Sequence, residues 1–314
     1  MKIAILGAGA MGSLIGAFLK KSGEDVLLVD PYEEHMNKIK TDGLTLHLNG
    51  NEEIIKINTV TSPKGQQPVD VLIVLVKGNY TDSALAGAKD LIGSKTYLLT
   101  LQNGIGNSEV LKKYAPESHV LKGVMKIASH MEAPGMIASK TMAGVPALFL
   151  GCAGKETEAV AVARQLEADF QSIDVCALYK ENIDFYIWSK AVNNIAVNCA
   201  CGIARVSIQN FLSTEDGWKI LEGCVSEVVA IANAKGIPLE TEAVIKTIKE
   251  NTIPKIGSHL PSSAQDMKAQ KKTEIDTLNG AIVRMGEQLQ IPTPCNALIT
   301  HFVKVIEANY ENQF

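Results

Sequence analysis

Residues 2–12 read KIAILGAGAMG, and this short stretch indicates the class of fold. Its first half is a run of apolar and β-branched residues typical of a buried strand. Its second half has the pattern G-x-G-x-x-G and leads into the apolar segment 14–20, which predicts a helix. The pattern comprises Gly7, Ala8, Gly9, Ala10, Met11 and Gly12. We therefore expect a dinucleotide-binding turn whose helix N-terminus faces a pyrophosphate, with a ligand-free glycine turn as the alternative.

Strand and helix signals alternate through the first half of the chain. Further apolar runs predict strands at 25–30, 69–77, 96–103, 120–128, 147–151 and 173–178. Helical segments lie between the first two strands and around 82–92. This alternation favours a parallel sheet with crossover helices, and near-continuous apolar strands indicate burial on both faces. Asn49-Gly50 between two strand-like runs predicts a hairpin.

The pattern changes after about residue 181. Apolar residues then recur at spacings of three and four, as in 221–236 and 296–310, which predicts helices. Gly236 is expected to cap the first of these helices, and Pro238 to stop it. The expected fold is α/β: a doubly wound, Rossmann-type NAD(P)-binding domain at 1–180, followed by an all-α substrate and catalytic domain at 181–314.

Composition and charge exclude several classes of partner. The chain has 46% hydrophobic and 20% charged residues, which is typical of a soluble globular protein. A net charge of −4 provides no basic surface for nucleic acid or an anionic membrane. The first apolar run ends in glycines well short of membrane length, so we expect a cytoplasmic protein.

The cysteines and histidines give no sign of a metal site. We interpret the dispersed cysteines as small buried hydrophobic residues in a reducing compartment. They are Cys152, Cys176, Cys199, Cys201, Cys224 and Cys295. Cys199-x-Cys201 has no second cysteine or histidine pair beside it, which makes a zinc site a minor alternative. No metal is expected.

Three polar residues at predicted strand ends are candidates for cofactor binding. Asp30 ends the second strand, where an acidic residue accepts hydrogen bonds from ribose hydroxyls and repels a 2′-phosphate. This position favours NADH over NADPH, although Asp30 could instead cap a turn before Pro31. Lys77 ends the third strand and could contact phosphate or adenine, or be an ordinary solvated lysine. Asn103 ends the fourth, where it could bind cofactor or serve only as a turn residue before Gly104.

The segment WSKAVNNIAVN, residues 188–198, combines helical spacing with unusual polar residues. Lys190, Asn194 and Asn198 recur every four positions and therefore share one stripe of a helix. A lysine among apolar neighbours is costly to desolvate, and asparagine is a mediocre helix former. The stripe predicts a helix side that lines a cleft, and such clefts favour domain junctions. The alternative is a solvated helix face, although such faces usually mix Glu, Lys and Arg.

A second polar cluster lies in PSSAQDMKAQKKTEIDTLNG, residues 261–280. Ser262 and Gln265 have the spacing of a capping box, so helix capping is the alternative to a binding role. Glu274 is a candidate acid, with an ordinary surface position as its alternative. If the helix runs unbroken, Glu274 shares a face with Ser263, Met267 and Gln270.

Four motifs together resemble one family. GAGAMG at 7–12, QNGIG at 102–106, W-x-K-x-x-x-N at 188–194 and PSxxQD…TEIDxxNG at 261–280 occur in the order typical of the ketopantoate reductases (2-dehydropantoate 2-reductases). The resemblance implies a Rossmann domain followed by a helical domain similar to the C-terminal domain of 6-phosphogluconate dehydrogenase, with the active site in the cleft between them. It also implies reduction of 2-dehydropantoate to (R)-pantoate by NADPH, a step towards pantothenate and coenzyme A.

The resemblance also implies roles for individual residues. Lys190 would be the general acid that protonates the nascent alkoxide, and Glu274 would bind the substrate's distal hydroxyl and help hold Lys190. Asn194 and Asn198 would contact substrate, Ser262 its carboxylate, and Asn103 would bridge cofactor and active site. A lysine suits this chemistry because hydride delivery to a ketone builds negative charge on oxygen.

Two departures from the family pattern leave alternatives open. Asp30-Pro31-Tyr32-Glu33-Glu34 stands where NADPH-using members carry an arginine, and Ser263-Ala264 replaces a bulkier apolar pair. An NAD-dependent D-2-hydroxyacid dehydrogenase of the D-mandelate type is therefore the main alternative. A β-hydroxyacid dehydrogenase and a non-catalytic dinucleotide sensor are less favoured. The expected partner is a small 2-keto acid, and the apolar faces of the C-terminal helices permit a homodimer.

Overall fold

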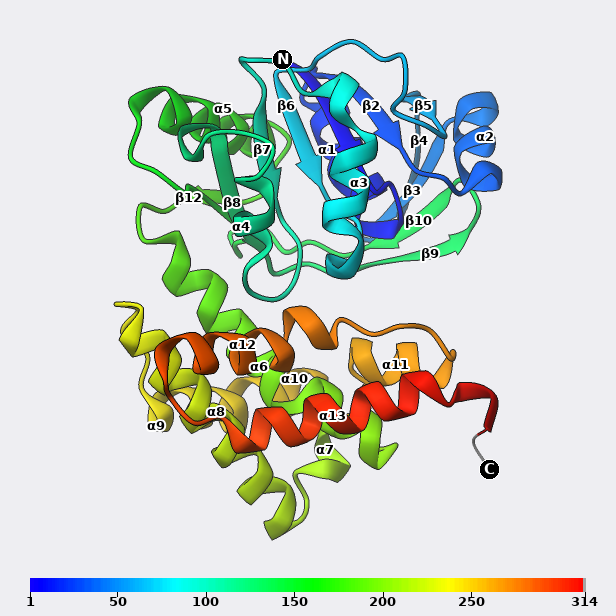
Figure 1. Cartoon of the computed structure of the whole chain (residues 1–314). Coiled ribbons are helices and arrows are strands. Elements are labelled where there is room, and N and C mark those ends of the chain that lie inside the picture. The colour runs from blue at the N-terminus through cyan, green and yellow to red at the C-terminus, as the bar shows by residue number, and fades with distance from the viewer. Residues whose placement is uncertain (313–314) are drawn as a thin grey trace. The chain divides into compact units, whose positions relative to one another are not determined.

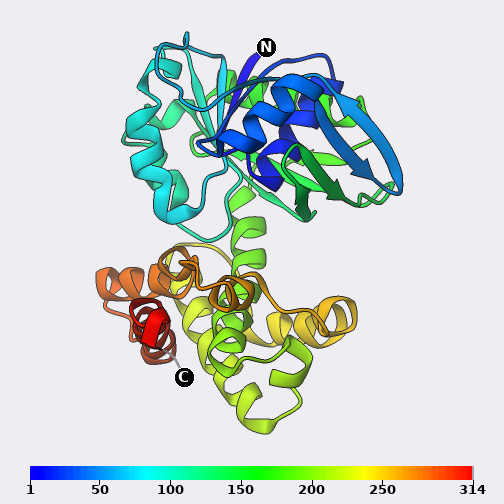
Figure 2. The same ribbon diagram turned by 90° about the vertical axis from the view of Figure 1, so that its right-hand side faces the viewer.

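The computed structural model describes residues 1–312, which form two compact units (Figures 1 and 2). Unit 1 comprises Met1–Gln102 and Asn107–Ile183. Unit 2 comprises the short segment Asn103–Gly106 and the chain from Asp184 onward. Four residues from the middle of the α/β sequence thus belong to the helical unit.

Unit 1 is built on an eight-stranded sheet with the order β12-β11-β8-β7-β6-β1-β2-β5. Its strands are β1 (Lys2–Leu6), β2 (Asp25–Val29), β5 (Asn58–Val60), β6 (Val71–Val74), β7 (Tyr97–Thr100), β8 (Val120–Met125), β11 (Leu148–Cys152) and β12 (Ala177–Tyr179). All neighbours are parallel except the antiparallel pair β8 and β11. The strand order reverses at β1, which lies between β2 and β6, and ligands of open α/β sheets bind at such a switch point. The predicted mostly parallel, doubly wound sheet is confirmed.

A second, four-stranded sheet has the order β4-β3-β10-β9. Its strands are β3 (Leu44–Leu48), β4 (Asn51–Ile55), β9 (Ser129–Ala133) and β10 (Met136–Ser139). The predicted hairpin is confirmed: Asn49 and Gly50 have φ of 55° and 85° and join β3 to β4 in a two-residue turn. The sequence did not predict β9 and β10, and the strand expected at 120–128 ends at Met125.

Helices cover both faces of the main sheet. The helices of unit 1 are α1 (Ala10–Lys21), α2 (Glu33–Asp42), α3 (Thr81–Gly87), α4 (Asn107–Leu111) and α5 (Thr157–Gln171), with short turns η1 (Gly78–Tyr80), η2 (Lys89–Leu91) and η3 (Glu117–His119). Ile3 and Ile5 of β1 share one apolar cluster with α1 and α5, whereas Ala4 and Leu6 share the other with α3 and α4. Alternate side chains of one strand thus enter two cores. In Figure 1, α3 and α4 lie in front of the sheet.

Unit 2 is helical. Its elements are α6 (Ile183–Ala204), α7 (Ile208–Phe211), α8 (Glu215–Ala234), α9 (Thr241–Thr247), the π-helix η4 (Ile248–Thr252), α10 (Ile253–Ile256), α11 (Ser262–Lys268), η5 (Ile275–Thr277), α12 (Asn279–Leu289), α13 (Pro294–Ala308) and η6 (Tyr310–Asn312). Apolar residues of α6 form one core with those of α8, α12 and α13. Gly236, with φ of 77°, follows the C-cap of α8 and Pro238 lies just beyond, as expected. No helix among residues 1–312 is long and apolar enough to cross a membrane.

The segment 261–280 is not one unbroken helix. Helix α11 ends at Lys268 because Gln270 adopts a left-handed φ of 53°. The amides of Gln270 and Lys271 donate to the carbonyls of Met267 and Asp266, which is the pattern of a Schellman cap. The hypothesis that Glu274 shares a helix face with Ser263, Met267 and Gln270 is therefore wrong.

Candidate functional site

The glycine turn after β1 has room for side chains at only some of its positions. Gly7 has φ of 96°, and a Cβ there would lie 2.4 Å from the amide nitrogen of Val76. A Cβ on Gly12 would lie 2.0 Å from the carbonyl oxygen of Gly7, because helix α1 packs closely on the turn. Around Gly9, by contrast, a Cβ would have nothing within 4 Å. The turn is therefore closed toward the protein and open at Gly9, which suits the approach of a phosphate group.

A pocket of about 580 Å³ lies against this turn in unit 1. Gly7, Gly9, Asp30, Lys77 and Tyr80 are among its lining residues, and the described lining includes no arginine. The volume and the open glycine backbone at the switch point fit a dinucleotide. This pocket is therefore the candidate nucleotide-binding site of unit 1.

Asp30 and Lys77 both reach this pocket, but from positions that differ in detail from the prediction. Asp30 directly follows β2, and its Oδ1 accepts a hydrogen bond of 2.9 Å from the amide of Tyr32, so it caps the turn and also lines the pocket. Lys77 does not end a strand. β6 stops at Val74, and Lys77 is the N-cap of η1.

Lys190 lies half-buried on α6, and its Nζ donates a hydrogen bond of 2.7 Å to Oδ1 of Asn103. Asn103 does not end a strand as predicted, because β7 stops at Thr100. It instead begins the segment Asn103–Gly106, which belongs to unit 2. Residues separated by 87 positions in the sequence thus meet in one hydrogen bond.

The segment Asn103–Gly106 is fixed to η5, the turn that follows Glu274. The amide of Ile105 donates to the carbonyl of Thr277 at 2.8 Å. Gly104 has φ of 88°, and a Cβ there would lie 2.3 Å from the same carbonyl oxygen. Glu274 is half-buried, and its own carbonyl accepts the amide of Thr277 at 3.0 Å. One short loop therefore connects Lys190 with the segment that carries Glu274.

The polar stripe of α6 continues from Lys190 to a second contact. Asn194 is half-buried, and Asn198 is only 6% exposed. Nδ2 of Asn198 donates to Oγ of Ser262 at 3.3 Å. The alternative of a solvated helix face is wrong for Asn198.

Ser262 does not cap its helix. The N-cap of α11 is Pro261 and makes no side-chain cap, and Nε2 of Gln265 donates to the carbonyl of Leu260 at 2.8 Å. The capping-box alternative is therefore wrong. Ser262 is exposed, whereas Ser263 is 1% exposed and faces the core.

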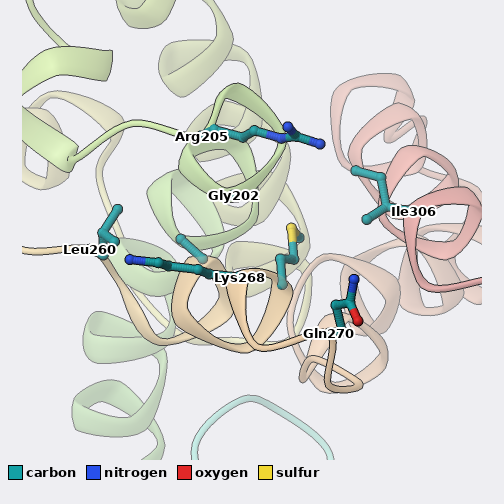
Figure 3. Close-up of a pocket in the computed structure, with 8 residues that line it drawn as sticks. Gly202, Arg205, Leu260, Lys268, Gln270 and Ile306 are labelled. Carbon is teal, nitrogen blue, oxygen red and sulfur yellow. The ribbon is translucent and has the colours of Figure 1, made fainter. Parts of the chain in front are cut away.

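Close packing of α11 on α6 brings Ser262 to Asn198. A Cβ on Gly202 would lie 2.6 Å from Sδ of Met267 and 3.3 Å from Cα of Ala264. Figure 3 shows this region, where Gly202, Arg205, Lys268 and Gln270 border a second pocket of about 470 Å³. None of the predicted catalytic or substrate-binding residues is among its described lining residues.

The cysteines of α6 are fully buried. Cys199 and Cys201 have no exposed surface, and burial raises the pKa of both thiols to about 12. Residues 1–312 contain no group of three or more His, Cys, Asp or Glu side chains placed to hold a metal ion. Small-residue packing is the role that the structure supports for this pair.

Sequence reasoning missed the residues that hold the site together. Ile105 and Thr277 contribute only backbone atoms, so their side chains carry no signal for this contact. Gly104 lies inside QNGIG, a motif that the sequence did single out. The alternative interpretation there was a simple turn at Asn103-Gly104. The need for glycine at this position follows from Thr277, which lies 173 positions further along the chain.

The open glycine turn and the lysine held by an amide define the class of a two-unit, nucleotide-dependent oxidoreductase. The models of two families, "Ketopantoate reductase PanE/ApbA" and "Ketopantoate reductase PanE/ApbA C terminal", match residues 3–152 and 182–307. The chain belongs to the ketopantoate reductase family.

Relatives from several organisms are similar over nearly the whole chain. A 2-dehydropantoate 2-reductase of Streptococcus pyogenes serotype M1 is 32% identical over 98% of both chains. A solved ternary complex of D-mandelate dehydrogenase with NADH and anilino(oxo)acetate is 32% identical, with a TM-score of 0.89 over 99% of this chain and 100% of that one. A ketopantoate reductase structure from Ralstonia eutropha JMP134 is 28% identical, with a TM-score of 0.87 over 99% and 100%.

Proposed function

We propose that this chain reduces 2-dehydropantoate to (R)-pantoate with a nicotinamide dinucleotide as the reductant. Near-full-length similarity to 2-dehydropantoate 2-reductases supports this substrate. The hydrogen bond of 2.7 Å from Lys190 to Asn103 carries the mechanistic part of the proposal, because it holds an ammonium group on the polar stripe of α6. Unit 1 would bind the cofactor, and unit 2 would bind the keto acid.

Each candidate residue has a role in this proposal. The bound nicotinamide supplies the hydride. Lys190 gives a proton from Nζ to the substrate oxygen as negative charge develops there, and Asn103 holds the ammonium in place through Oδ1. Asn194, Asn198 and Ser262 orient the keto acid through uncharged hydrogen-bonding groups, and Glu274 binds its distal hydroxyl. Gly7, Ala8, Gly9, Ala10, Met11, Gly12, Asp30, Lys77 and Asn103 form the cofactor side of the site.

The role of Lys190 is tested by Lys190→Ala. We expect kcat to fall by about a hundredfold to ten-thousandfold, because the proton donor is lost. Binding of the dinucleotide, followed by its fluorescence, should change little. Lys219→Ala is the matched control, since Lys219 is 64% exposed on α8 and forms only surface ion pairs. An unchanged kcat in Lys190→Ala would remove the lysine from the mechanism.

We further propose that NADH is preferred over NADPH. Asp30 lines the cofactor pocket, whose described lining has no arginine to receive a 2′-phosphate. Asp30→Asn keeps an acceptor for the amide of Tyr32 but removes the charge. We expect the ratio of kcat/KM for NADH over NADPH to fall by about tenfold in this variant, measured on one keto acid. A wild-type preference for NADPH would contradict the proposal.

A D-2-hydroxyacid dehydrogenase of the D-mandelate type is the second candidate. The similarity to the NADH-bound D-mandelate dehydrogenase structure favours it, together with Asp30 in the cofactor pocket. Steady-state kinetics on 2-dehydropantoate, 2-ketoisovalerate and phenylglyoxylate distinguish the two. A highest kcat/KM for 2-dehydropantoate supports the first proposal, and one for phenylglyoxylate supports the second. Cofactor binding without turnover of any keto acid would indicate a sensor.

A further inference from the structure

A fully buried histidine lies beneath the glycine turn. His35 on α2 has no exposed surface, although its helix is otherwise mostly polar. Its Nδ1 accepts a hydrogen bond of 2.8 Å from the amide of Gly135, in the turn between β9 and β10. Its Nε2 lies 3.0 Å from Oγ of Ser13 on α1, and this hydroxyl donates to the carbonyl of Ala8 at 2.8 Å. Four segments of unit 1 therefore meet in one buried hydrogen-bonded chain.

The direction of every hydrogen bond in this series follows from its two ends, the N–H of Gly135 and the carbonyl of Ala8. The amide of Gly135 can only donate, so Nδ1 of His35 is an acceptor and the ring hydrogen of the neutral imidazole is on Nε2. Nε2 then donates to Oγ of Ser13, whose own hydrogen goes to the Ala8 carbonyl. A protonated ring would put an N–H opposite the Gly135 N–H. The arrangement therefore requires neutral His35.

The last acceptor of this series of hydrogen bonds, the carbonyl of Ala8, is part of the glycine turn. The carbonyl of Ala8 and the N–H of Gly9 belong to the same peptide unit, which is planar and trans, so they point in opposite directions. Ser13 holds the carbonyl toward the protein interior. The Gly9 N–H is thereby directed away from the interior, and Gly9 lines the cofactor pocket with open space around it.

We propose that Ser13 and His35 are positioning residues for the cofactor, which fix the Ala8–Gly9 peptide so that its N–H faces the phosphates. The inference rests on the proposed function in that the ligand of unit 1 is a nicotinamide dinucleotide. Neither residue contacts the ligand through its side chain. Their effect is on binding, because a peptide that is free to rotate loses part of its preorganisation for the anion.

The surroundings of His35 match this role. Burial lowers the pKa of His35, whereas the charge of Asp30, just after β2, and the backbone of Ala8 oppose this shift. The ring of Tyr32 stacks on the imidazole, with centroids 6.0 Å apart and planes at 17°. Ser13 and Gly135 occupy both ring nitrogens from α1 and from the β9–β10 turn. The two hydrogen bonds of the ring thus fit its uncharged form, and burial outweighs the opposing charge of Asp30.

Two substitutions at position 35 separate the two hydrogen bonds of the His35 ring. Gln places an amide nitrogen at about the depth of Nε2, so His35→Gln can still donate to Ser13 but loses the bond from Gly135. Asn places an amide oxygen at about the depth of Nδ1, so His35→Asn can still accept from Gly135 but loses the bond to Ser13. Ser13→Ala removes the hydroxyl itself. Ser22→Ala is the matched control, because it deletes a similar hydroxyl-to-carbonyl bond of 2.8 Å at the other end of α1.

The measurements are the Kd for NADH, by fluorescence titration without keto acid, and kcat at saturating NADH. Circular dichroism checks that each variant is folded at the temperature used. Ser13→Ala should raise the Kd by about tenfold, because the buried carbonyl of Ala8 loses its donor. His35→Asn should raise it by about the same factor, because the hydroxyl of Ser13 loses the N–H that holds it toward Ala8. Their kcat should change less than twofold. His35→Gln and Ser22→Ala should bind NADH within about twofold of the wild type.

Three results would overturn the proposal. Unchanged Kd values in Ser13→Ala and His35→Asn would show that the peptide needs no support. Equal losses in His35→Gln and His35→Asn would show that general packing, and not the bond to Ser13, is responsible. If the wild-type chain binds neither NADH nor NADPH, the proposed function fails first and the inference fails with it.

Discussion

Burial lowers the pKa of His35 from its ordinary value of 6.5, against the opposing field of Asp30. The folded chain therefore keeps this ring neutral at pH values where the unfolded chain already binds a proton. Stability rises with pH wherever the unfolded state holds more protons. The contribution of His35 is thus complete above the unfolded pKa and is lost as the pH falls from about 6.5 through the lower folded pKa.

The sign of this pH dependence of stability can be tested by urea denaturation at pH 7 and pH 5. The wild type should lose more of its free energy of unfolding over this interval than His35→Gln, which has no titrating ring at position 35. His47 contributes with the opposite sign, because its hydrogen bonds to Glu52 and Glu132 raise its pKa, but His47 is common to both proteins. Equal pH dependence in the two proteins would contradict a buried neutral His35.

Single residues were predictable where a periodic pattern carried them. Lys190, Asn194 and Asn198 follow from helical spacing, and the structure places Asn198 against Ser262. His35 was not predictable, because its helix EEHMNKIK appears solvated in the sequence. Its burial depends on Gly135, which is 100 positions away and belongs to strands that the sequence did not predict.

The contact between segment Asn103–Gly106 and η5 makes a prediction for two neighbouring glycines. Both Gly104 and Gly106 have positive φ, at 88° and 92°, so alanine is strained at either position. Only at Gly104 would the new Cβ meet another group, the carbonyl of Thr277 at 2.3 Å. The matched pair therefore separates backbone strain from displacement of the segment.

We expect Gly106→Ala to cost about 1–2 kcal/mol of unfolding free energy with kcat nearly unchanged. Gly104→Ala should cost more and lower kcat at least tenfold, because a displaced segment moves Asn103 away from Lys190. Urea denaturation and steady-state kinetics on the folded fraction measure both effects. Similar kcat values in the two variants would show that the packing of Gly104 does not position the lysine.

The boundaries of elements were harder to predict than their existence. The buried strands and the amphipathic helices α8 and α13 carry strong apolar periodicity, and they were expected close to where they occur. The end of α11 was missed, because the left-handed residue of its cap is Gln270 where glycine is usual. Strands β9 and β10 are short, and SHMEA and MIAS carry little β signal on their own.

At the scale of the whole molecule, the order of signals along the sequence was enough to predict the fold class. Alternating strands and helices followed by helices alone gave a parallel sheet and a helical part, and both are present. The assignment of Asn103–Gly106 to unit 2 could not be predicted, because the segment follows a strand of unit 1 and has no helical character. It depends on contacts with α6 and η5 that only the folded chain provides.

This assignment has a consequence for how such a gene can be cut and recombined. The backbone passes from one unit to the other after Gln102, returns after Gly106 and passes again after Ile183, so neither unit is encoded by one continuous stretch. A fragment beginning at Asp184 would be missing four of its own residues, including the acceptor for Lys190. The two halves are therefore poor candidates for modular exchange. A chimaera that takes its nucleotide-binding half from another enzyme must keep residues Asn103–Gly106 of this chain within that half.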